Sequence, residues 1–205
     1  MKLRSTLICF AIGYLLFLSL GVAAQAPAAD KQIIDLSEWV KKTSKLGTTS
    51  FRGGEFFMRA KQRGYYYVLV APEGYTSEGA TVEVTVRNIT GGSSRLGYGL
   101  IFHSDQTPLT QDYAILIDTV KKRYRVVRHE PDNERTLVAW TSSASIRPGR
   151  QANILKAVDR GKTTDLYING KLVNSVDNTY AFKGGAPGLY TDAVNIAFKS
   201  FTIVK

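Results

Sequence analysis

The chain has almost no cysteine. Its single thiol, Cys9, lies in an apolar stretch near the N-terminus, so no intrachain disulfide can form. Lys2 and Arg4 precede this stretch, which runs from Leu7 to Leu20, and small residues follow at 22–24. A basic, then apolar, then small order is typical of a secretory signal peptide. An exported domain without disulfides depends on its hydrophobic core, and about 180 residues are enough to build one.

The N-terminal pattern divides the chain into three parts. We predict a signal peptide at 1–24, a spacer at 25–31 and one domain at 32–205. The apolar stretch approaches the roughly 18 residues of a membrane-spanning helix, so an uncleaved anchor is the alternative. Cleavage would remove two of the 27 basic residues and none of the 17 acidic ones, which lowers the net charge from +10 to +8. These features indicate a secreted or periplasmic bacterial protein, with membrane contact only through an uncleaved N-terminal segment.

Long amphipathic helices are also missing. Apart from one helical turn expected at 36–40, no segment carries an apolar stripe with the period of a helix. Short apolar-alternating segments separated by turn residues predict an all-β, antiparallel fold. We expect strands at 81–88, 97–103, 112–118, 122–129, 135–140, 152–158, 165–168, 171–176 and 194–204. Asn169-Gly170 separates two of them and is the preferred pair for a two-residue type I′ hairpin.

The strand segments carry a distinctive series of motifs. They are Tyr98-Gly-Leu-Ile-Phe102, Asp112-Tyr-Ala-Ile-Leu-Ile117, Tyr124-Arg-Val-Val-Arg128, Trp140, Leu166-Tyr-Ile-Asn-Gly-Lys171 and Gly188-Leu-Tyr190, followed by Phe198 and Phe201. The series resembles the concanavalin A-like jelly roll. More narrowly, it is similar to the laminin-G-like modules of secreted bacterial proteins, which grade into the 3-keto-disaccharide hydrolase-like domain family. The resemblance implies a two-sheet antiparallel β-sandwich, with sugars bound on the concave face or at rim loops in many relatives. Such an analogy needs support from the site itself.

Recognised catalytic motifs are absent. Glycoside hydrolysis normally uses two carboxylates, and the glucanases of this architecture supply them from a Glu-x-Asp-x-x-Glu strand. Here Glu83, Asp118 and Asp165 each stand alone, although they could meet across strands. Phosphate-binding Gly-x-x-x-x-Gly-Lys and nucleophile Gly-x-Ser-x-Gly motifs are missing too. We predict no catalytic residue, because solvated strand-end charges are the simpler interpretation.

Ligands for a transition metal are scarce. The two histidines, His103 and His129, are far apart in sequence, and no cysteine remains to assist them. Loop oxygens of Asp105, Asp112 and Asp192 are weak candidates for a structural calcium, although they lack the density of a calcium loop. We expect no other cofactor.

Tyrosine, by contrast, is plentiful, with 11 residues in the chain. Sugars stack on aromatic rings while polar side chains take their hydroxyls. Strand alternation puts His103 on the same face as Gly99 and Ile101, and Arg125 on the same face as His129. The predicted ligand-binding site consists of His103, Tyr113, Arg125, Trp140 and Tyr190. Burial of Tyr113 and Trp140 in the core is the alternative.

A basic, aromatic segment lies in the N-terminal half of the domain. Arg59, Lys61 and Arg63 precede three consecutive tyrosines at 65–67. These side chains suit an acidic polysaccharide or an anionic envelope surface. Nucleic acid would use the same side chains, but export argues against it, so we predict no nucleic-acid partner.

The sequence therefore predicts a secreted, non-catalytic carbohydrate- or cell-envelope-binding module, whose partner is a glycan or an anionic envelope polymer. A glycoside-acting hydrolase of the 3-keto-disaccharide type is one alternative. A structural or adhesion module that binds another protein is the second. Convergent carboxylates in a deep cleft would favour the hydrolase, a shallow aromatic groove the binding module, and a flat apolar patch the protein partner.

Overall fold

A computed structural model of the chain describes residues 30–41, 44–179 and 185–205. The predicted signal peptide and residues 25–29 of the predicted spacer lie outside the described residues. Within the described part, the only helical element is η1 (Leu36–Trp39), a single 3-10 turn whose first turn is capped by the Asp35 carboxylate. It matches the helical turn expected at 36–40. No helix in this part is long and apolar enough to cross a membrane.

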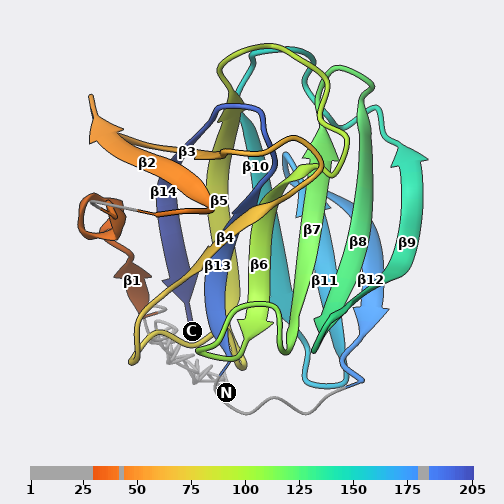
Figure 1. Cartoon of the computed structure of the whole chain (residues 1–205). Coiled ribbons are helices and arrows are strands. Elements are labelled where there is room, and N and C mark those ends of the chain that lie inside the picture. The colour runs from red at the N-terminus through yellow and green to blue at the C-terminus, as the bar shows by residue number, and fades with distance from the viewer. Residues whose placement is uncertain (1–29, 42–43, 180–184) are drawn as a thin grey trace, which may run out of the picture.

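The rest of the described chain forms two antiparallel sheets (Figure 1). The eight-stranded sheet consists of β1 (Lys31–Ile33), β2 (Gly47–Arg52), β3 (Glu55–Ala60), β5 (Thr81–Asn88), β10 (Asn153–Asp159), β11 (Thr163–Ile168), β12 (Lys171–Asp177) and β14 (Ile196–Val204). The six-stranded sheet consists of β4 (Tyr67–Val70), β6 (Tyr98–Ser104), β7 (Asp112–Asp118), β8 (Arg123–Glu130), β9 (Asn133–Ser142) and β13 (Ala186–Thr191). The first sheet has the order β12-β11-β10-β5-β14-β3-β2, with β1 beside β14, and the second β4-β13-β6-β7-β8-β9. The predicted two-sheet antiparallel sandwich is confirmed.

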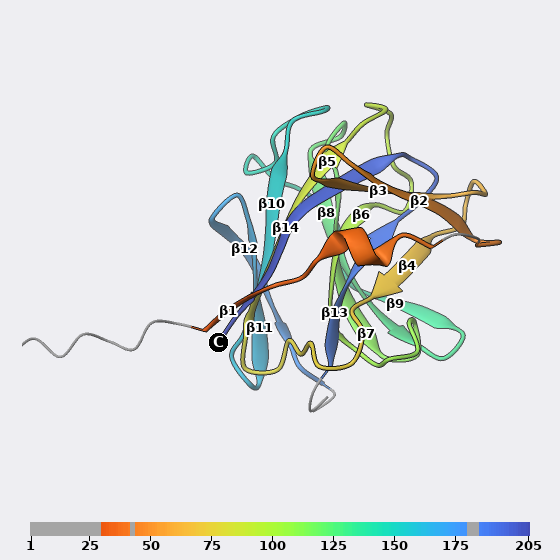
Figure 2. The ribbon, with the colours of Figure 1, turned by 90° about the vertical axis from the view of Figure 1, so that its left-hand side faces the viewer.

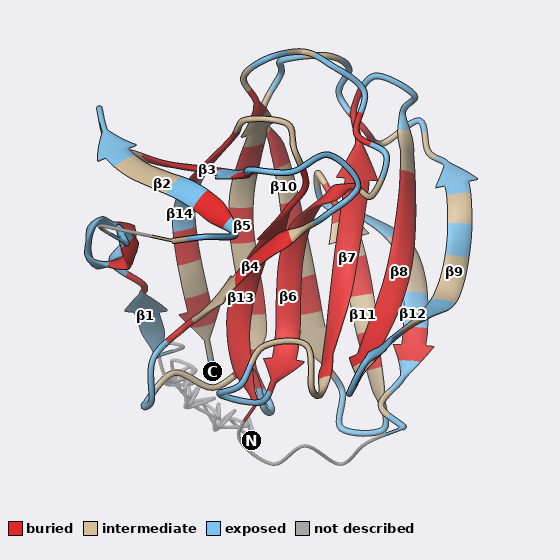
Figure 3. Ribbon diagram, in the orientation of Figure 1, coloured by how far each residue is buried: buried red, intermediate tan, exposed pale blue. Residues whose placement is uncertain are grey.

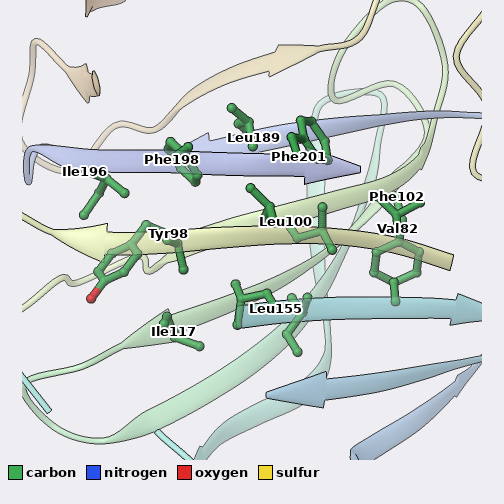
Figure 4. Close-up of a cluster of buried hydrophobic side chains, with 14 of the residues drawn as sticks. Val82, Tyr98, Leu100, Phe102, Ile117, Leu155, Leu189, Ile196, Phe198 and Phe201 are labelled. Carbon is green, nitrogen blue, oxygen red and sulfur yellow. The ribbon is translucent and has the colours of Figure 1, made fainter. Parts of the chain in front are cut away.

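The core lies between the two sheets (Figure 4). In β5, Val82, Val84 and Val86 are buried while the residues between them are partly exposed, because alternate side chains of a strand point to opposite faces. Phe198 and Phe201 of the neighbouring strand β14 lie beside them, point into the same core and are fully buried. Burial of a side chain of this size contributes about 1.5–3 kcal/mol. The sandwich is thus held by apolar packing, as a domain without disulfides requires.

The tight hairpins have the backbone conformation that their residues favour. Asn169 and Gly170 have φ of 51° and 79°, and Gly53 and Gly54 have φ of 59° and 74°. Two consecutive positive φ angles define a type I′ turn, whose twist matches that of the flanking strands. The hairpin predicted at Asn169-Gly170 is confirmed, and Gly53-Gly54 forms a second one between β2 and β3.

The central strands of the six-stranded sheet, β13, β6, β7 and β8, are buried on both faces, whereas the edge strand β9 is largely exposed (Figure 3). Every residue of β6 and β7 is buried, as their continuous apolar character predicts. On the face away from the other sheet, here called the outer face, a second apolar layer is formed by Val68, Ile101, Ala114, Leu116, Val127 and Tyr190. Figure 2 shows this sheet curving, with its edge strands β4 and β9 turned away from the eight-stranded sheet. The outer face is therefore the hollowed one.

Candidate functional site

The outer face carries a group of polar and aromatic side chains, which we call the outer-face cluster. Its members are Tyr66, Asp112, Arg125, His129, Glu134 and Tyr190. They come from the segment before β4 and from strands β7, β8, β9 and β13, which lie far apart in the sequence. Sheet pairing brings them together: His129 of β8 is opposite both Asp112 of β7 and Glu134 of β9.

His129 is the centre of the cluster. Its Nδ1 lies 2.6 Å from Asp112 Oδ1, and its Nε2 lies 3.2 Å from Glu134 Oε2. The imidazole is buried, and Asp112 is fully buried. The second oxygen of Asp112 accepts a hydrogen bond from the Leu109 backbone amide. Both ring nitrogens therefore face carboxylate oxygens, which is the arrangement that suits a protonated imidazolium.

The carboxylates determine the charge of this histidine. Burial by itself lowers the pKa of His129, but the hydrogen bonds to Asp112 and Glu134 outweigh it and raise the pKa to about 9. Burial alone would raise the pKa of Glu134, whereas its hydrogen bond to His129 and the charge of Arg125 hold that pKa below its ordinary value. At neutral pH the cluster thus contains an imidazolium and an ionised glutamate.

Arg125 fixes the same glutamate from the other side. Its two terminal nitrogens lie 2.8 and 3.5 Å from the two oxygens of Glu134, and its Nε donates to the Leu96 carbonyl over 2.9 Å. The guanidinium also lies 5.5 Å from the centre of the Trp140 ring. Arg123 lies over the same ring at 4.2 Å. The fork–fork geometry orients the Glu134 carboxylate as well as neutralising it.

Two tyrosines complete the cluster. The ring of Tyr66 lies 5.1 Å from that of Tyr190 and 5.7 Å from the imidazole of His129. Tyr190 is fully buried, and its hydroxyl donates to Glu134 over 3.5 Å, a long hydrogen bond. Tyr66 is only half-buried, so it is the aromatic side chain of the cluster that a ligand can reach.

A cavity of about 360 Å³ opens beside Tyr66. Tyr66, His129 and Glu134 contribute to its wall, together with the loop at 108–110 and the β8–β9 turn at 130–133. Its size is at the lower end of the roughly 300–1,000 Å³ of small-ligand pockets. The cavity thus offers one aromatic ring and one oriented carboxylate to a small polar ligand.

The structure divides the predicted site residues between the two faces of the six-stranded sheet. Arg125, Trp140 and Tyr190 are brought together on the outer face. Tyr113 lies in the core between the sheets, where it stacks on Phe102 with ring centres 5.4 Å apart. Its hydroxyl accepts a hydrogen bond from the Thr179 amide. Tyr113 therefore follows the alternative of a core tyrosine with its polar atom satisfied.

Strand alternation predicts that His103 shares the outer face with Ile101, but in the structure it does not. Its φ of 54° departs from strand geometry, and the pairing of β6 with β13 shifts register between Ile101 and Ser104. This bulge reverses the alternation and turns the imidazole toward the core, 6.4 Å from the Tyr113 ring. A single sequence does not reveal such a bulge, since no glycine marks its position.

The surroundings of His103 contain a serine and an aspartate. Ser77 Oγ lies 3.2 Å from Nδ1, and Asp159 Oδ2 lies 3.8 Å from Nε2. Ser77 is buried, and its hydroxyl already donates to the Gly185 carbonyl and accepts from the His103 amide. Burial lowers the pKa of His103. The group therefore ties the end of β6 to its neighbours, and its serine is not exposed to a substrate.

The three aspartates considered for calcium have different surroundings in the structure. Asp112 belongs to the outer-face cluster, and Asp105 is exposed. Asp192 is buried and accepts hydrogen bonds from Ser94 Oγ and from the backbone amides of 95, 96 and 194. No group of three His, Cys, Asp or Glu residues in the described chain is placed to hold a metal ion.

The three strand acids considered for catalysis do not converge either. Asp118 lies on β7 of the six-stranded sheet, where Ser93 Oγ and Arg123 contact its carboxylate. Glu83 and Asp165 lie on the other sheet, and β10 separates their strands.

Sequence reasoning missed Tyr66 and Glu134 as parts of one site. Alternation did place His129 beside Arg125 on one face of β8. The partner Glu134 depends on the register of the β8–β9 hairpin, which is irregular further along the two strands. Tyr66 is one of three consecutive tyrosines that go to different places: Tyr65 is exposed, Tyr66 joins the cluster and Tyr67 enters the core. The pattern of the run does not indicate which one faces the site.

The two-sheet antiparallel sandwich is similar in fold to the jelly-roll sandwiches of galectin-like and GH16 proteins. Carbohydrate binding module CBM66 from Bacillus subtilis is 19% identical with a TM-score of 0.53, over 78% of this chain and 92% of that one. A galectin-like-fold protein from Bacillus subtilis is 13% identical with a TM-score of 0.55, over 78% and 86%. The Bacteroides ovatus mixed linkage glucan PUL GH16, in complex with a G4G4G3G product, is 10% identical with a TM-score of 0.53, over 89% and 96%. At these identities the similarity shows the fold alone. Neither a protein-family model nor a curated protein matches the sequence.

Proposed function

We propose that this chain is a secreted or periplasmic, non-catalytic carbohydrate-binding module that binds sugar in the cavity beside Tyr66. The observation that carries the proposal is the half-buried Tyr66 ring beside a glutamate whose carboxylate is oriented by Arg125 and His129. An aromatic face accepts the C–H face of a pyranose, and an ordered carboxylate accepts hydrogen bonds from its hydroxyls. The signal-peptide pattern at 1–24 supports export.

The ordered carboxylate is well suited to binding. Glu134 is held by charged donors on two sides, so its position changes little when a ligand arrives. Preorganised acceptors reduce the entropy lost on association. Because the pKa of Glu134 lies below its ordinary value, the acceptor stays ionised throughout the neutral range.

The lowered pKa of Glu134 also makes hydrolysis the less favoured function. A glycosidase needs a carboxylic acid with a raised pKa to protonate the leaving group. The reachable carboxyl of the cluster has a lowered pKa, and Asp112 is fully buried against His129. The structural neighbours named above include a binding module and a glycoside hydrolase, so fold analogy supports a carbohydrate ligand without choosing between binding and cleavage.

A matched pair of tyrosine variants tests the proposal. The chain from Gln25 onward, which contains every strand of the sandwich, is screened on a glycan array, and the affinity for any sugar bound is then measured by calorimetry. We expect Tyr66→Ala to weaken binding by about tenfold, since an aromatic contact of this kind contributes about 1.5 kcal/mol. Tyr65→Ala removes the exposed neighbouring ring and should leave the affinity unchanged.

Two results would contradict the proposal. One is equal binding by both variants and the parent, which would place the sugar elsewhere. The other is release of a shorter glycan during incubation, which would support the hydrolase. Thermal unfolding of both variants shows whether the fold is kept.

A further inference from the structure

We infer that the chain has a second binding site, for an acidic polysaccharide, in a basic hollow beside the β2–β3 hairpin. The hollow has a volume of about 460 Å³ and is lined by Lys41, Ser44, Lys45, Gly47, Thr48, Thr49 and Lys61. None of these residues lines the cavity beside Tyr66. The inference is therefore independent of the function proposed for the outer-face cluster.

The basic charge here is concentrated and largely uncompensated. Residues 41–63 contain seven lysines and arginines but a single acid, Glu55. That acid is paired with Arg87, 2.6 Å away on β5. Within the described chain, no ion pair is formed by Lys41, Lys45, Arg59, Lys61 or Arg63. Unpaired charges of one sign around a hollow attract an oppositely charged polymer.

Hydrogen bonds hold the walls of the hollow in place. The Lys61 Nζ donates to the Ser44 carbonyl over 2.6 Å, and the Lys61 amide donates to the Leu46 carbonyl. The Lys41 amide donates to Thr49 Oγ1 over 2.9 Å. A Cβ at position 47 would lie 2.0 Å from the Tyr67 ring, so this close approach requires glycine. The segment that follows η1 is thus fastened to the hairpin, and both sides present ammonium groups.

The lining favours a polysaccharide over other polyanions. Among the described residues, only lysine, serine, threonine and glycine line the hollow. Their hydroxyls can form hydrogen bonds with sugar hydroxyls, and their ammonium groups can pair with carboxylates or sulfates. Single-stranded nucleic acid needs aromatic rings on which its bases stack, and none is among the described lining residues. An anionic membrane binds through inserted apolar side chains as well as charge, and none is among the described lining residues. Leu46 and Phe51 are exposed close to the lining in sequence, so vesicles are included as a competing partner in the test.

Lysine also limits the selectivity of the site. An ammonium group is a point charge and does not impose the planar, two-bond geometry of arginine. The hollow should therefore accept uronate and sulfate groups alike.

The test measures binding of the chain from Gln25 onward to polygalacturonate, dextran sulfate and neutral dextran at 50 and 200 mM NaCl. We expect both acidic polymers to bind and neutral dextran not to bind to the hollow. For about three neutralised charges, release of counterions weakens binding by on the order of tenfold between these salt concentrations. Phosphatidylglycerol vesicles and oligo(dT) serve as the competing polyanions.

A charge-matched pair of triple variants locates the site. K41Q, K45Q and K61Q together should reduce binding of both acidic polymers at 50 mM NaCl by at least about tenfold, because three lysines contribute through contact and counterion release. K121Q, K162Q and K171Q together remove the same charge from exposed positions elsewhere and should change it less than about twofold. Tyr66→Ala should leave acidic-polymer binding intact, which separates failure here from failure of the proposed sugar site.

Several outcomes would overturn the inference. Equal losses in the two triple variants would show general charge attraction. Lysine-dependent binding to vesicles or oligo(dT) with none to the acidic polymers would assign the hollow to a different partner. Lys61 supports the segment at 44–46, so the single variant K45Q provides an independent test, because the Lys45 side chain makes no hydrogen bond within the described chain. An unchanged affinity of K45Q for the acidic polymers would also contradict the inference.

Discussion

His103 and His129 show how neighbouring groups decide the charge of a buried imidazole. Both rings are almost fully buried, and burial disfavours the charged form of each. His129 has two carboxylates within hydrogen-bonding distance, and its pKa rises in spite of burial. His103 has hydroxyl neighbours and a more distant Asp159, and its pKa falls. At neutral pH His129 is therefore a charged partner in ion pairs, whereas His103 is a neutral residue of the core.

The charge of His129 makes the stability of the fold depend on pH. Its folded-state pKa of about 9 is above the ordinary 6.5, so the folded chain binds this proton more tightly than the unfolded chain does. The stabilisation is complete below about pH 6.5 and is lost as the pH rises through 9. It amounts to at most about 3 kcal/mol. We expect the free energy of unfolding, measured with urea, to fall by up to this amount between pH 6 and 9.5.

The control is the double variant Asp112→Asn with His129→Gln, which removes both members of the buried ion pair. Replacing only one would leave a buried charge without its partner, at a cost of about 3–5 kcal/mol. The double variant should show a much flatter dependence over this pH interval. Parallel curves for the parent and the double variant would contradict the assignment.

At the scale of elements, two type I′ hairpins use different chemistry. The β2–β3 turn, Gly53-Gly54, is open, and a Cβ at either glycine would meet nothing within 4 Å. The β11–β12 turn has Asn169 at its first position, and that side chain accepts from the Ile154 amide and donates to the Ser145 carbonyl and to Asn153 Oδ1. One turn only reverses the chain, whereas the other also fastens the 145–154 segment.

This difference predicts unequal effects of two turn substitutions. Asn169→Gly keeps the positive φ but loses three hydrogen bonds, so we expect a loss of about 2 kcal/mol in the free energy of unfolding. Gly53→Asn introduces the residue that type I′ turns favour and should change stability by less than about 0.5 kcal/mol. Urea unfolding midpoints at constant slope measure both. A neutral Asn169→Gly would mean that the turn requires only its backbone conformation.

For the whole molecule, the distribution of charge separates two kinds of binding. Opposite charges are paired within the outer-face cluster, so a neutral sugar that binds there displaces few salt ions. By contrast, the basic side chains of 41–63 that the structure describes form no ion pair. The same sandwich thus has one face suited to hydrogen bonding and stacking and one corner suited to ionic attraction.

Salt should therefore distinguish the two. We expect the affinity for a neutral glycan at the Tyr66 cavity to change by less than about twofold between 50 and 300 mM NaCl, because screening acts on net charges. The K41Q, K45Q, K61Q triple variant should bind that glycan as the parent does. Calorimetry at the two salt concentrations provides the measurement. A strong salt dependence for the neutral glycan would show that the cluster binds through charge after all.

Much of the sandwich follows from local sequence. Strands β5 and β7 begin and end where alternation predicts, because one wet face or full burial leaves a clear pattern over seven or eight residues. Strands β1 to β4 and β13 were not predicted. Strand β13 contains Pro187 and Gly188, which weaken a strand pattern. Its place in the sheet comes from pairing with β4 and β6.

The sequence by itself determined the all-β class, the main strands, the type I′ turn and the lack of a covalent staple, because these depend on residues close together in the chain. The tertiary structure decided the site. Pairing of β7, β8 and β9 places Asp112, His129 and Glu134 in one ionic group, and a bulge turns His103 into the core. Contacts between residues distant in sequence depend on register and on irregularities of one residue, and a shift of one residue reverses the face of every side chain that follows.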